Sequence, residues 1–352
     1  MSPYRVDPAD PAPRMNDRYS RQVQLPQIGH TGQERIRRAS VLLVGCGATG
    51  GTIAAFLVRA GVGLLRIADR DWVELNNLQR QILFNEEDAR SESLKSEAAA
   101  RSLSRVNSDV RIQPVVLDVT AATIGALLDD VDLVLDGADN FETRYLINDA
   151  CVQSGKPWIY TGAVGTEGMS LFIHPGVSAC FRCLFPVPPA AGSAATCDQA
   201  GVLGPAVGVI ASVTAANALR WLATPEDPPH SDLICVDAWE GAWDRLTVTR
   251  KPNCPCCEQR EFPYLSPDSS ALVVSLCGRD AVQISPAAPA NLDLSLIAGR
   301  LAGLGEVELR PVLLRFRSAD CRLTLFADGR TVVHDTDDPI RARALHARYV
   351  GA

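Results

Sequence analysis

The sequence predicts an α/β protein in which a doubly wound, mostly parallel sheet precedes a small C-terminal α/β domain. Three observations support this prediction. Short apolar runs alternate with helical stretches up to about residue 160, as in parallel sheets covered by helices. A glycine-rich turn, residues 45–50, follows the first apolar run, which is where such sheets bind phosphates. Two cysteine pairs further along the chain suggest a structural metal site, a zinc knuckle.

The composition is that of a globular protein. At 352 residues the chain is long for one domain and comfortable for two, and 47% hydrophobic residues can build a core. The net charge of −7 argues against a broad binding surface for nucleic acid. Because the first 15 residues lack the apolar segment of a signal peptide, the eleven cysteines indicate a reducing compartment and a cytoplasmic protein.

The first domain is expected over residues 17–262, after a disordered lead-in over residues 1–16. An apolar run suited to a buried parallel strand opens it, and an alanine-rich charged stretch typical of a helix follows later. The predicted strands are residues 41–44, 64–69, 110–117, 131–136, 157–160 and 169–174. The predicted helices are residues 51–60, 92–106, 140–154 and 204–219. The last helix is short for a membrane span, which needs about 20 apolar residues, so we expect it to be buried in the protein.

The second domain is expected over residues 263–352, behind a proline-punctuated linker. Its predicted strands are residues 272–284, 312–316, 322–326 and 331–334, and its predicted helices are residues 294–304 and 339–350. Asp328-Gly329 predicts the hairpin turn before the last strand. Because none of the motifs discussed below lies in this domain, we expect it to help recognise a partner protein.

The glycine turn, Gly45-Cys-Gly-Ala-Thr-Gly50, has the G-x-G-x-x-G spacing between a predicted strand and a predicted helix. Gly45, Gly47 and Gly50 would let backbone N–H groups approach a phosphate at the helix N-terminus. Asp69 ends the next strand about 20 residues further on, where its carboxylate can accept hydrogen bonds from ribose hydroxyls. The alternative is a glycine turn without a ligand.

Two further groups of residues favour ATP over a nicotinamide cofactor. Arg80 and Lys95 have no obvious use in a dehydrogenase, whereas negative charge develops at the α-phosphate when ATP is attacked. The alternative is that both are solvated surface charges. Asp139 and Asn140 follow a predicted strand at the edge where such sheets bind ligands. Asp139 could hold Mg²⁺ and Asn140 could contact the nucleotide, and the pair could also cap the next helix.

The cysteine pairs are Cys180-Phe-Arg-Cys183 and Cys254-Pro-Cys-Cys257. Two Cys-x-x-Cys turns supply the four tetrahedral ligands of zinc without further help. Such a site has no open position, so we expect a structural metal. Cys256 could replace Cys257 as a ligand; we favour Cys257 because its spacing from Cys254 repeats that of the first pair.

Together these motifs resemble the MoeB/ThiF (HesA) family, ubiquitin-activating-like enzymes that adenylate small sulfur-carrier proteins. The resemblance extends from about Asp17 to Cys257 and includes the glycine turn and both cysteine pairs. Its other segments are Arg18-Tyr-Ser-Arg-Gln22, Asn77-Leu-Gln-Arg-Gln81, Leu135-Asp-Gly-Ala-Asp-Asn140 and Thr196-Cys-Asp-Gln-Ala-Gly201. The resemblance implies a homodimer that uses ATP, Mg²⁺ and Zn²⁺ and acts on a ubiquitin-like carrier ending in Gly-Gly.

The resemblance also implies roles for individual residues. Arg21 resembles an arginine that reaches the ATP phosphates of the neighbouring subunit. Asp139 resembles the aspartate linked to Mg²⁺. The expected nucleotide site comprises Gly45, Gly47, Ala48, Gly50, Asp69, Asn77, Arg80, Lys95, Asp139 and Asn140. The family often has a further glycine where this chain has Ala48. The segment between Arg80 and Lys95 is also slightly long.

Cys197 is the candidate nucleophile. It lies in a segment rich in proline, alanine, glycine and serine, and the equivalent position in some family members forms a covalent link to the activated carrier. In other members it is dispensable, so an inert loop cysteine is the alternative.

The function implied is ATP-dependent adenylation of a carrier's C-terminal glycine, followed by thiocarboxylate formation for molybdopterin, thiamine or a related sulfur-containing product. The tail is shorter than a rhodanese domain, so we expect the sulfur to come from a separate donor. The alternatives are an NAD-dependent oxidoreductase and a non-catalytic scaffold that binds a carrier.

Overall fold

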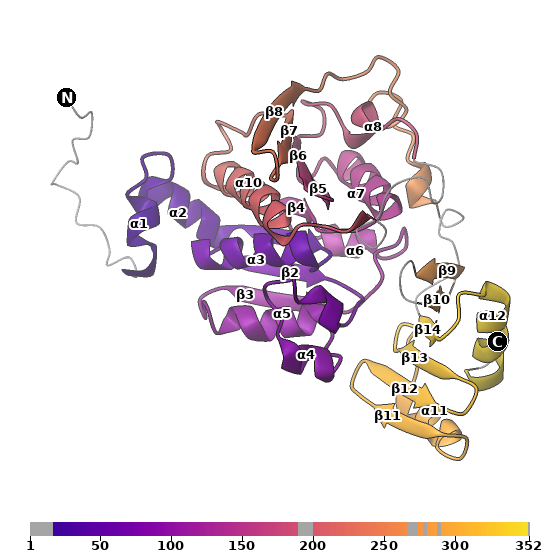
Figure 1. The fold of residues 1–352 in the computed structure, drawn as a ribbon. Helices are drawn as coiled ribbons and strands as arrows, with labels where there is room; N and C mark the ends of the chain where they lie inside the picture. Colours follow the sequence, from indigo (N-terminus) through magenta and orange to yellow (C-terminus); the bar gives the residue numbers. More distant parts are fainter. Residues whose placement is uncertain (1–16, 189–199, 267–272, 277–279, 287–289, 351–352) are drawn as a thin grey trace, which may run out of the picture.

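The computed structural model describes residues 17–188, 200–266, 273–276, 280–286 and 290–350 (Figure 1). Two sheets dominate this part of the chain, one in each predicted domain. The expected lead-in, residues 1–16, and the candidate nucleophile Cys197 lie outside the described residues.

The first sheet has eight strands in the order β3-β2-β1-β4-β5-β6-β7-β8. The parallel strands are β1 (Ser40–Val44), β2 (Leu64–Ala68), β3 (Arg111–Val115), β4 (Leu133–Asp136) and β5 (Trp158–Val164). The antiparallel extension consists of β6 (Glu167–Ile173), β7 (Asp232–Asp237) and β8 (Ala242–Thr247). The last two strands are absent from the sequence-based prediction. β8 is exposed along its whole length, so it lacks the apolar run of a buried strand.

Helices cover both faces of this sheet, which confirms the doubly wound prediction. The longer helices are α2 (Gly29–Arg38), α3 (Ala48–Ala60), α5 (Lys95–Ser104), α7 (Phe141–Ser154) and α10 (Gly204–Ala223). The shorter segments are η1 (Asp17–Tyr19), α1 (Ser20–Val23), η2 (Leu75–Asn77), α4 (Glu86–Arg90), α6 (Ile124–Leu128), α8 (Phe181–Leu184) and η3 (Pro263–Leu265).

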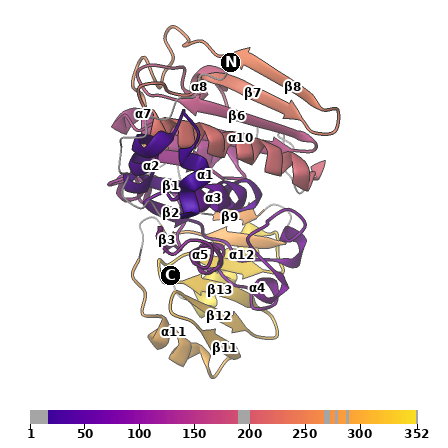
Figure 2. The same cartoon turned by 90° about the vertical axis from the view of Figure 1, so that its left-hand side faces the viewer.

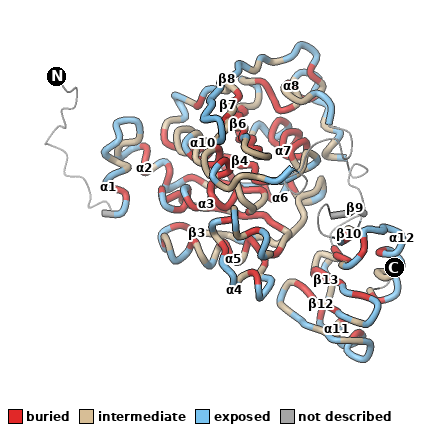
Figure 3. Tube along the Cα trace, viewed as in Figure 1, coloured by how far each residue is buried: buried red, intermediate tan, exposed pale blue. Residues whose placement is uncertain are grey.

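Alternate side chains of β1 enter the two halves of the core. Val41 and Leu43 pack with α3, α5 and α10 on one face, whereas Leu42 and Val44 pack with α6 and α7 on the other. All four are fully or almost fully buried, as Figure 3 shows for the centre of the sheet. The chain leaves β1 and β4 towards opposite faces, so the carboxyl ends of these strands form the topological switch point at which α/β sheets bind ligands.

Helix α10 is long and apolar enough to cross a membrane by length and composition, with a mean hydropathy of 1.4. Half of its most apolar window is nevertheless buried inside the protein. It packs against α3 and the sheet, with Ala211, Ala218 and Leu222 in the core. This placement agrees with the expected buried helix.

The C-terminal domain contains a six-stranded antiparallel sheet in the order β11-β12-β13-β14-β10-β9. Its strands are β9 (Val273–Leu276), β10 (Ala281–Ile284), β11 (Glu306–Leu309), β12 (Leu313–Arg317), β13 (Arg322–Phe326) and β14 (Thr331–His334), and its helices are α11 (Leu294–Leu301) and α12 (Pro339–Tyr349). The single strand predicted over residues 272–284 is instead the pair β9 and β10. The predicted Asp328-Gly329 turn joins β13 to β14, with Gly329 at φ +90°.

The C-terminal domain packs against the first domain on the side of α4 and α5, as the side view in Figure 2 shows. Trp72 and Leu94 of the first domain share an apolar cluster with Leu313, Phe326 and Val332 of the second. The two domains therefore meet beside the ends of β2 and β3.

Candidate active site

The glycine turn brings the loops after β1 and β4 into contact. Gly45 adopts φ +86°, and a Cβ on it would overlap the backbone of Gly137. A Cβ on Gly50 would overlap the carbonyl oxygen of Gly45. Gly47 differs, because the nearest atom to a Cβ there would be Nε2 of Gln81, at 3.8 Å. Gly45 and Gly50 thus permit close packing, whereas Gly47 faces open space.

Helix α3 begins directly after this space, at Ala48, and runs for 13 residues. Gly47 is the N-cap residue, and no side chain of the described residues caps this N-terminus. The first N–H groups of a helix lack partners within the helix and carry the positive end of its dipole. The turn can therefore receive a phosphate.

Asp69 follows β2 and lies against the glycine turn. Its carboxylate accepts hydrogen bonds from the backbone N–H of Cys46 at 2.6 Å and from that of Asp71 at 2.7 Å. Burial raises the pKa of the Asp69 carboxyl, and the Lys95 ammonium opposes that rise. Each carboxylate oxygen keeps a second lone pair, so Asp69 can still accept a ribose hydroxyl while it braces the turn.

Lys95 is the first residue of α5 and is almost completely buried. Its Nζ lies 3.2 Å from Oδ2 of Asp71, and its backbone N–H donates to the carbonyl of Asp71 at 2.8 Å. The structure therefore brings Lys95 beside Asp69, and it is not a solvated surface charge. Asp71 was not predicted as a site residue. The sequence feature that could have identified it is its position two residues after Asp69.

Asn77 ends η2, and the segment after it contains Arg80 and Gln81. Asn77 is buried, and its Oδ1 accepts the N–H of Glu74 at 3.2 Å. Arg80 is partly exposed and donates through Nη1 to the carbonyl of Asn76 at 2.8 Å. Gln81 is 4% exposed, and its Oε1 is a buried oxygen with no hydrogen-bond partner among the described residues.

Gln81 is therefore a site residue that the sequence marks only as part of a motif. A buried polar atom without a partner is costly in a native protein and calls for an explanation. The open space above Gly47 lies beside this side chain. A bound nucleotide is a suitable partner for the Gln81 amide.

The loop after β4 is held by an ion pair inside the core. Asp136 is fully buried, and its Oδ2 accepts Nε of Arg144 at 3.2 Å. Arg144 also donates through Nη2 to the carbonyl of Ala138 at 2.8 Å. Burial raises the pKa of the Asp136 carboxyl, while Arg144 opposes that rise. The pair fixes the loop that carries Asp139.

Asp139 and Asn140 stand at the end of this loop. Asn140 is the N-cap of α7, because its Oδ1 accepts the N–H of Thr143 at 2.8 Å. Its Nδ2 donates to Oδ1 of Asp139 at 3.1 Å. The exposed Asp139 carboxylate keeps lone pairs for a cation. Carboxylate oxygens suit Mg²⁺, so Asp139 fits the expected metal role.

Arg21 lies far from the glycine turn of its own chain. The neighbouring Gln22 donates to the carbonyl of Ala60, the last residue of α3. A helix of 13 residues is about 20 Å long, and the glycine turn is at its other end. The exposed Arg21 side chain therefore does not contact the glycine turn of its own chain.

The cysteine cluster forms where the two Cys-x-x-Cys turns meet. The sulfur atoms of Cys180, Cys183, Cys254 and Cys257 all lie within 4.8 Å of one another. Contacts of 3.7 Å between Cys180 and Cys254 and 3.5 Å between Cys183 and Cys257 are close to the edge of about 3.8 Å expected for a zinc tetrahedron. The four thiols fit a structural Zn²⁺.

Cys256 lies outside this tetrahedron. It is fully buried, and its Sγ accepts Nδ2 of Asn148 at 3.1 Å. Its Sγ therefore contacts α7 and also lies near Cys180, but it is not one of the four sulfur atoms that all lie within 4.8 Å of one another. This geometry supports Cys257 as the fourth ligand.

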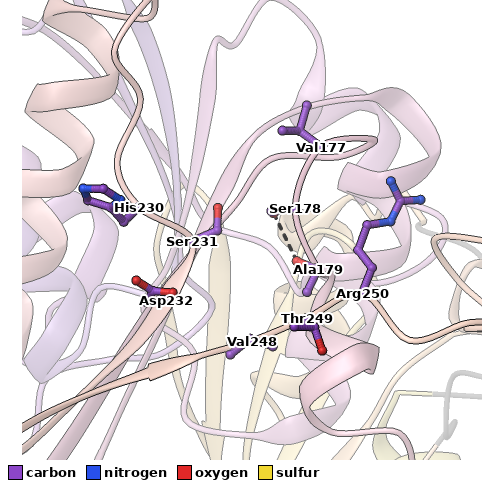
Figure 4. Close-up of a pocket in the computed structure, with 9 residues that line it drawn as sticks. All are labelled: Val177, Ser178, Ala179, His230, Ser231, Asp232, Val248, Thr249 and Arg250. Carbon is purple, nitrogen blue, oxygen red and sulfur yellow. Dashed lines mark hydrogen bonds between the residues drawn. The ribbon is translucent and has the colours of Figure 1, made fainter.

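A depression of about 490 Å³ lies elsewhere on the molecule. It is lined by the segment after β6, the start of β7 and the end of β8, with His230 and Arg250 on opposite sides (Figure 4). The start of β7 is at the amino edge of the sheet, whereas the glycine turn is at the carboxyl edge. This depression is separate from the candidate nucleotide site.

Comparison with known proteins agrees with this geometry. The model of the ThiF family matches residues 19–256. The chain is 41% identical over 340 residues to the "Sulfur carrier protein ThiS adenylyltransferase" of Bacillus subtilis, covering 96% of this chain and 100% of that protein. It is 42% identical over 245 residues to the "Adenylyltransferase and sulfurtransferase MOCS3" of Sus scrofa, covering 69% of this chain and 53% of that protein.

Solved structures share the first domain. The structure of E. coli MccB with ATP matches with a TM-score of 0.61 and 25% identity, covering 69% of this chain and 75% of that one. The complex of MccB with MccA-N7isoASN matches with a TM-score of 0.62 over the same shares.

Proposed function

The chain belongs to the ThiF family, and from this premise we propose that it is an adenylyltransferase that activates the C-terminal carboxylate of a ubiquitin-like sulfur-carrier protein. The observation that carries the proposal is the match to a ThiS adenylyltransferase along almost the whole chain. It is supported by the meeting of the glycine turn, Asp69 and Lys95 at one edge of the sheet. An NAD-dependent oxidoreductase and a non-catalytic scaffold are not favoured.

The reaction consumes ATP and the carrier. A carboxylate oxygen of the terminal glycine attacks the α-phosphorus, and the bond to the bridging oxygen of pyrophosphate breaks. The products are a carrier acyl-adenylate and pyrophosphate. Negative charge grows on the phosphate oxygens in the transition state, so cations placed there accelerate the step. Lys95 and Arg80 are the proposed cations, and the N-terminus of α3 adds the positive end of its dipole.

The nucleotide is proposed to lie with its ribose at Asp69 and its phosphates over Gly47 and Ala48. The N-terminus of α3 and the open space at Gly47 support this placement. Asp139 would hold Mg²⁺, which would neutralise charge on the phosphates. Asn77 and Asn140 line the same edge, and both already brace their own loops.

We propose a homodimer in which Arg21 of one subunit serves the nucleotide of the other. Two features support this arrangement: Arg21 is exposed, and it lies at the far end of α3 from its own glycine turn. Random 1:1 mixing of catalytically dead Arg21→Ala and Asp139→Ala subunits should restore about a quarter of wild-type activity to the mixture if the residues act across the interface, because about half of the dimers are mixed and each mixed dimer has one intact site.

A sulfur source then displaces AMP from the acyl-adenylate to leave a thiocarboxylate. Cys197 is the proposed nucleophile of this stage. We propose that a separate protein donates the sulfur, because Cys321, the cysteine among the described residues of the C-terminal domain, is buried. We place the protein in the cytoplasm, because cysteines that serve a metal site and catalysis are typical of a reducing compartment.

The carrier is proposed to be of the ThiS type, and thiamine synthesis the pathway it serves. The Bacillus relative named for ThiS matches the C-terminal domain as well as the first domain, whereas the MOCS3 match covers 69% of this chain. A molybdopterin carrier is the second candidate.

Carrier-dependent exchange between ATP and labelled pyrophosphate tests the proposal. The purified protein should catalyse exchange with a carrier ending in Gly-Gly and should lose it when the final glycine is deleted. Exchange that is independent of the carrier, or absent with every Gly-Gly carrier encoded beside the gene, would overturn the assignment.

A further inference from the structure

Three arginines of the C-terminal domain contact the backbone of the first domain next to the candidate nucleotide site. Arg330 donates through Nη1 to the carbonyl of Arg70 at 3.3 Å. Arg310 and Arg315 donate through Nη2 to the carbonyls of Ser91 and Glu92, at 3.1 Å and 2.9 Å. These carbonyls belong to two segments, residues 70–73 and residues 91–95.

Arg330 is an unusual residue for a domain interface. Its side chain is 2% exposed, and Nε and Nη2 are buried nitrogens with no hydrogen-bond partner among the described residues. The guanidinium carbon lies 3.7 Å from the centroid of the Phe326 ring, and Nε lies 3.7 Å from Oδ2 of Asp328. Burial lowers the pKa of Arg330. A buried charge with unpaired nitrogens reduces the stability of a protein. Its presence at this interface therefore calls for a role other than stability.

The Arg330 contact adjoins a polar network that also crosses the interface. Arg70 forms an ion pair with Asp118, in which Nη1 of Arg70 lies 2.9 Å from each of the two carboxylate oxygens. Gln283 of the C-terminal domain donates through Nε2 to Oδ2 of Asp118 at 2.8 Å. Arg70 lies between Asp69 and Asp71, so this network fixes the backbone on either side of both carboxylates.

Arg315 holds a backbone conformation that few side chains favour. Glu92 adopts φ +45°, in the left-handed region. The Arg315 guanidinium binds both the carbonyl of Glu92 and its carboxylate, the latter at 2.9 Å. Lys95 begins α5 three positions further along the chain, so the turn at Glu92 sets where α5 starts.

The two segments are also tied to each other. The backbone N–H of Val73 donates to the carbonyl of Ser93 at 2.8 Å, and that of Lys95 donates to the carbonyl of Asp71 at 2.8 Å. Trp72 of the first segment and Leu94 of the second form a β-bridge with each other, and both are buried against the C-terminal domain. A shift in the backbone of either segment would therefore move Asp69, Asp71 and Lys95 together.

We propose that Arg315 and Arg330 are positioning residues through which the C-terminal domain sets the geometry of Asp69 and Lys95 for MgATP. The inference rests on the proposed nucleotide site. It gives the C-terminal domain a part in nucleotide binding, separate from any part in partner recognition. Neither arginine contacts the nucleotide in this proposal; each acts through the backbone that it holds.

The test compares four variants of the full-length protein: Arg315→Ala, Arg330→Ala, Arg330→Lys and Arg348→Ala. MgATP affinity is measured by calorimetry without a carrier, and KM for ATP, KM for the carrier and kcat are measured by pyrophosphate exchange. Arg348 is the matched control, because it pairs with Asp320 at 2.7 Å on the exposed surface of the same domain. Melting temperature and zinc content report on the fold.

We expect Arg315→Ala and Arg330→Ala each to weaken MgATP binding about five- to tenfold, the effect of losing one hydrogen bond of ordinary strength. KM for ATP should rise by a similar factor while kcat changes by less than about twofold, since binding is lost equally in the ground and transition states. KM for the carrier should not change. Arg330→Lys keeps a donor for the carbonyl of Arg70 and should recover most of the affinity, and Arg348→Ala should match wild type.

Wild-type ATP affinity in folded Arg315→Ala and Arg330→Ala proteins would overturn the positioning role, even if both melt at a lower temperature. If Arg330→Ala does not fold, Arg315→Ala decides, since its side chain is partly exposed and its removal leaves no large cavity. The two proposals can also fail separately. If the variants bind ATP more weakly but the wild-type protein catalyses no carrier-dependent exchange, the positioning role stands and the proposed function is overturned.

Discussion

At the scale of single residues, the glycine turn shows why spacing alone does not assign roles. Gly45 and Gly50 are needed because the loops after β1 and β4 touch there. Gly47 is the glycine that faces open space, beside the unpartnered amide oxygen of Gln81. The sequence predicts the turn, but which glycines pack against the neighbouring loop and which one faces open space depends on that loop.

Gly50→Ala should therefore destabilise the protein and weaken ATP binding. The added Cβ would overlap the carbonyl oxygen of Gly45, and forced overpacking costs on the order of 1–3 kcal/mol. Gly51→Ala is the control, since its Cβ would meet Leu83 at an ordinary distance of 3.5 Å. Melting curves with and without MgATP measure both effects. Equal stability and affinity in the two variants would show that the turn tolerates the displacement.

Asp139→Ala and Arg80→Ala should reduce carrier-dependent pyrophosphate exchange by on the order of 100-fold or more if, as proposed, these groups act where charge develops. Both side chains are at least partly exposed, so the fold should persist. Circular dichroism and zinc content check that it does. Exchange within a few-fold of wild type in folded Asp139→Ala would remove Asp139 from the site.

At the scale of elements, the cysteine knuckle joins segments far apart in the sequence. The Cys180–Cys183 turn contains the short helix α8, and the Cys254–Cys257 turn follows β8. Neither is long enough to hold its own position. Metal bonds would supply that stability, since the binding energy of a structural zinc is also folding energy.

Cys254→Ser should lose zinc and stability together, whereas Cys256→Ala should keep one zinc per chain. The difference follows from geometry, because Cys254 belongs to the cluster of four sulfur atoms and Cys256 faces Asn148. Metal analysis of freshly purified proteins, followed by thermal unfolding, measures both results. Loss of zinc in Cys256→Ala with retention in Cys257→Ala would exchange the two assignments.

At the scale of the whole molecule, the C-terminal domain is packed against the nucleotide-binding domain. The shared cluster around Trp72 and Leu94, the carbonyl contacts of three arginines and the Gln283–Asp118 hydrogen bond all cross the interface. The sequence places the motifs upstream and so suggests a module that could be removed. The interface indicates that the two domains are coupled.

Deleting the chain after Ser266 should consequently weaken MgATP binding as well as carrier binding. Trp72 and Leu94, now 8% and 3% exposed, would face water, and Asp118 would lose its Gln283 contact. Calorimetry with ATP and a binding assay with the carrier separate the two effects. A truncated protein with full ATP affinity and weakened carrier affinity would instead favour an independent recognition module.

The sequence alone determined the doubly wound first domain, the glycine turn, the family and the cysteine pairs. Each depends on local features: an apolar run fits a buried strand, three glycines allow a tight turn, and two Cys-x-x-Cys turns fit a tetrahedral metal. These features are set by residues a few positions apart. They can therefore be read without knowing how distant segments pack.

Tertiary structure alone shows how the segments that carry the candidate site residues are held together. The ion pair of Lys95 with Asp71, the clamp of Arg144 on the loop before Asp139 and the orientation of Cys256 join segments distant in sequence. The hydrogen bonds from Arg315 and Arg330 to the carbonyls of Glu92 and Arg70 join residues from different domains. Such contacts depend on how completed elements pack against one another, which no local pattern specifies.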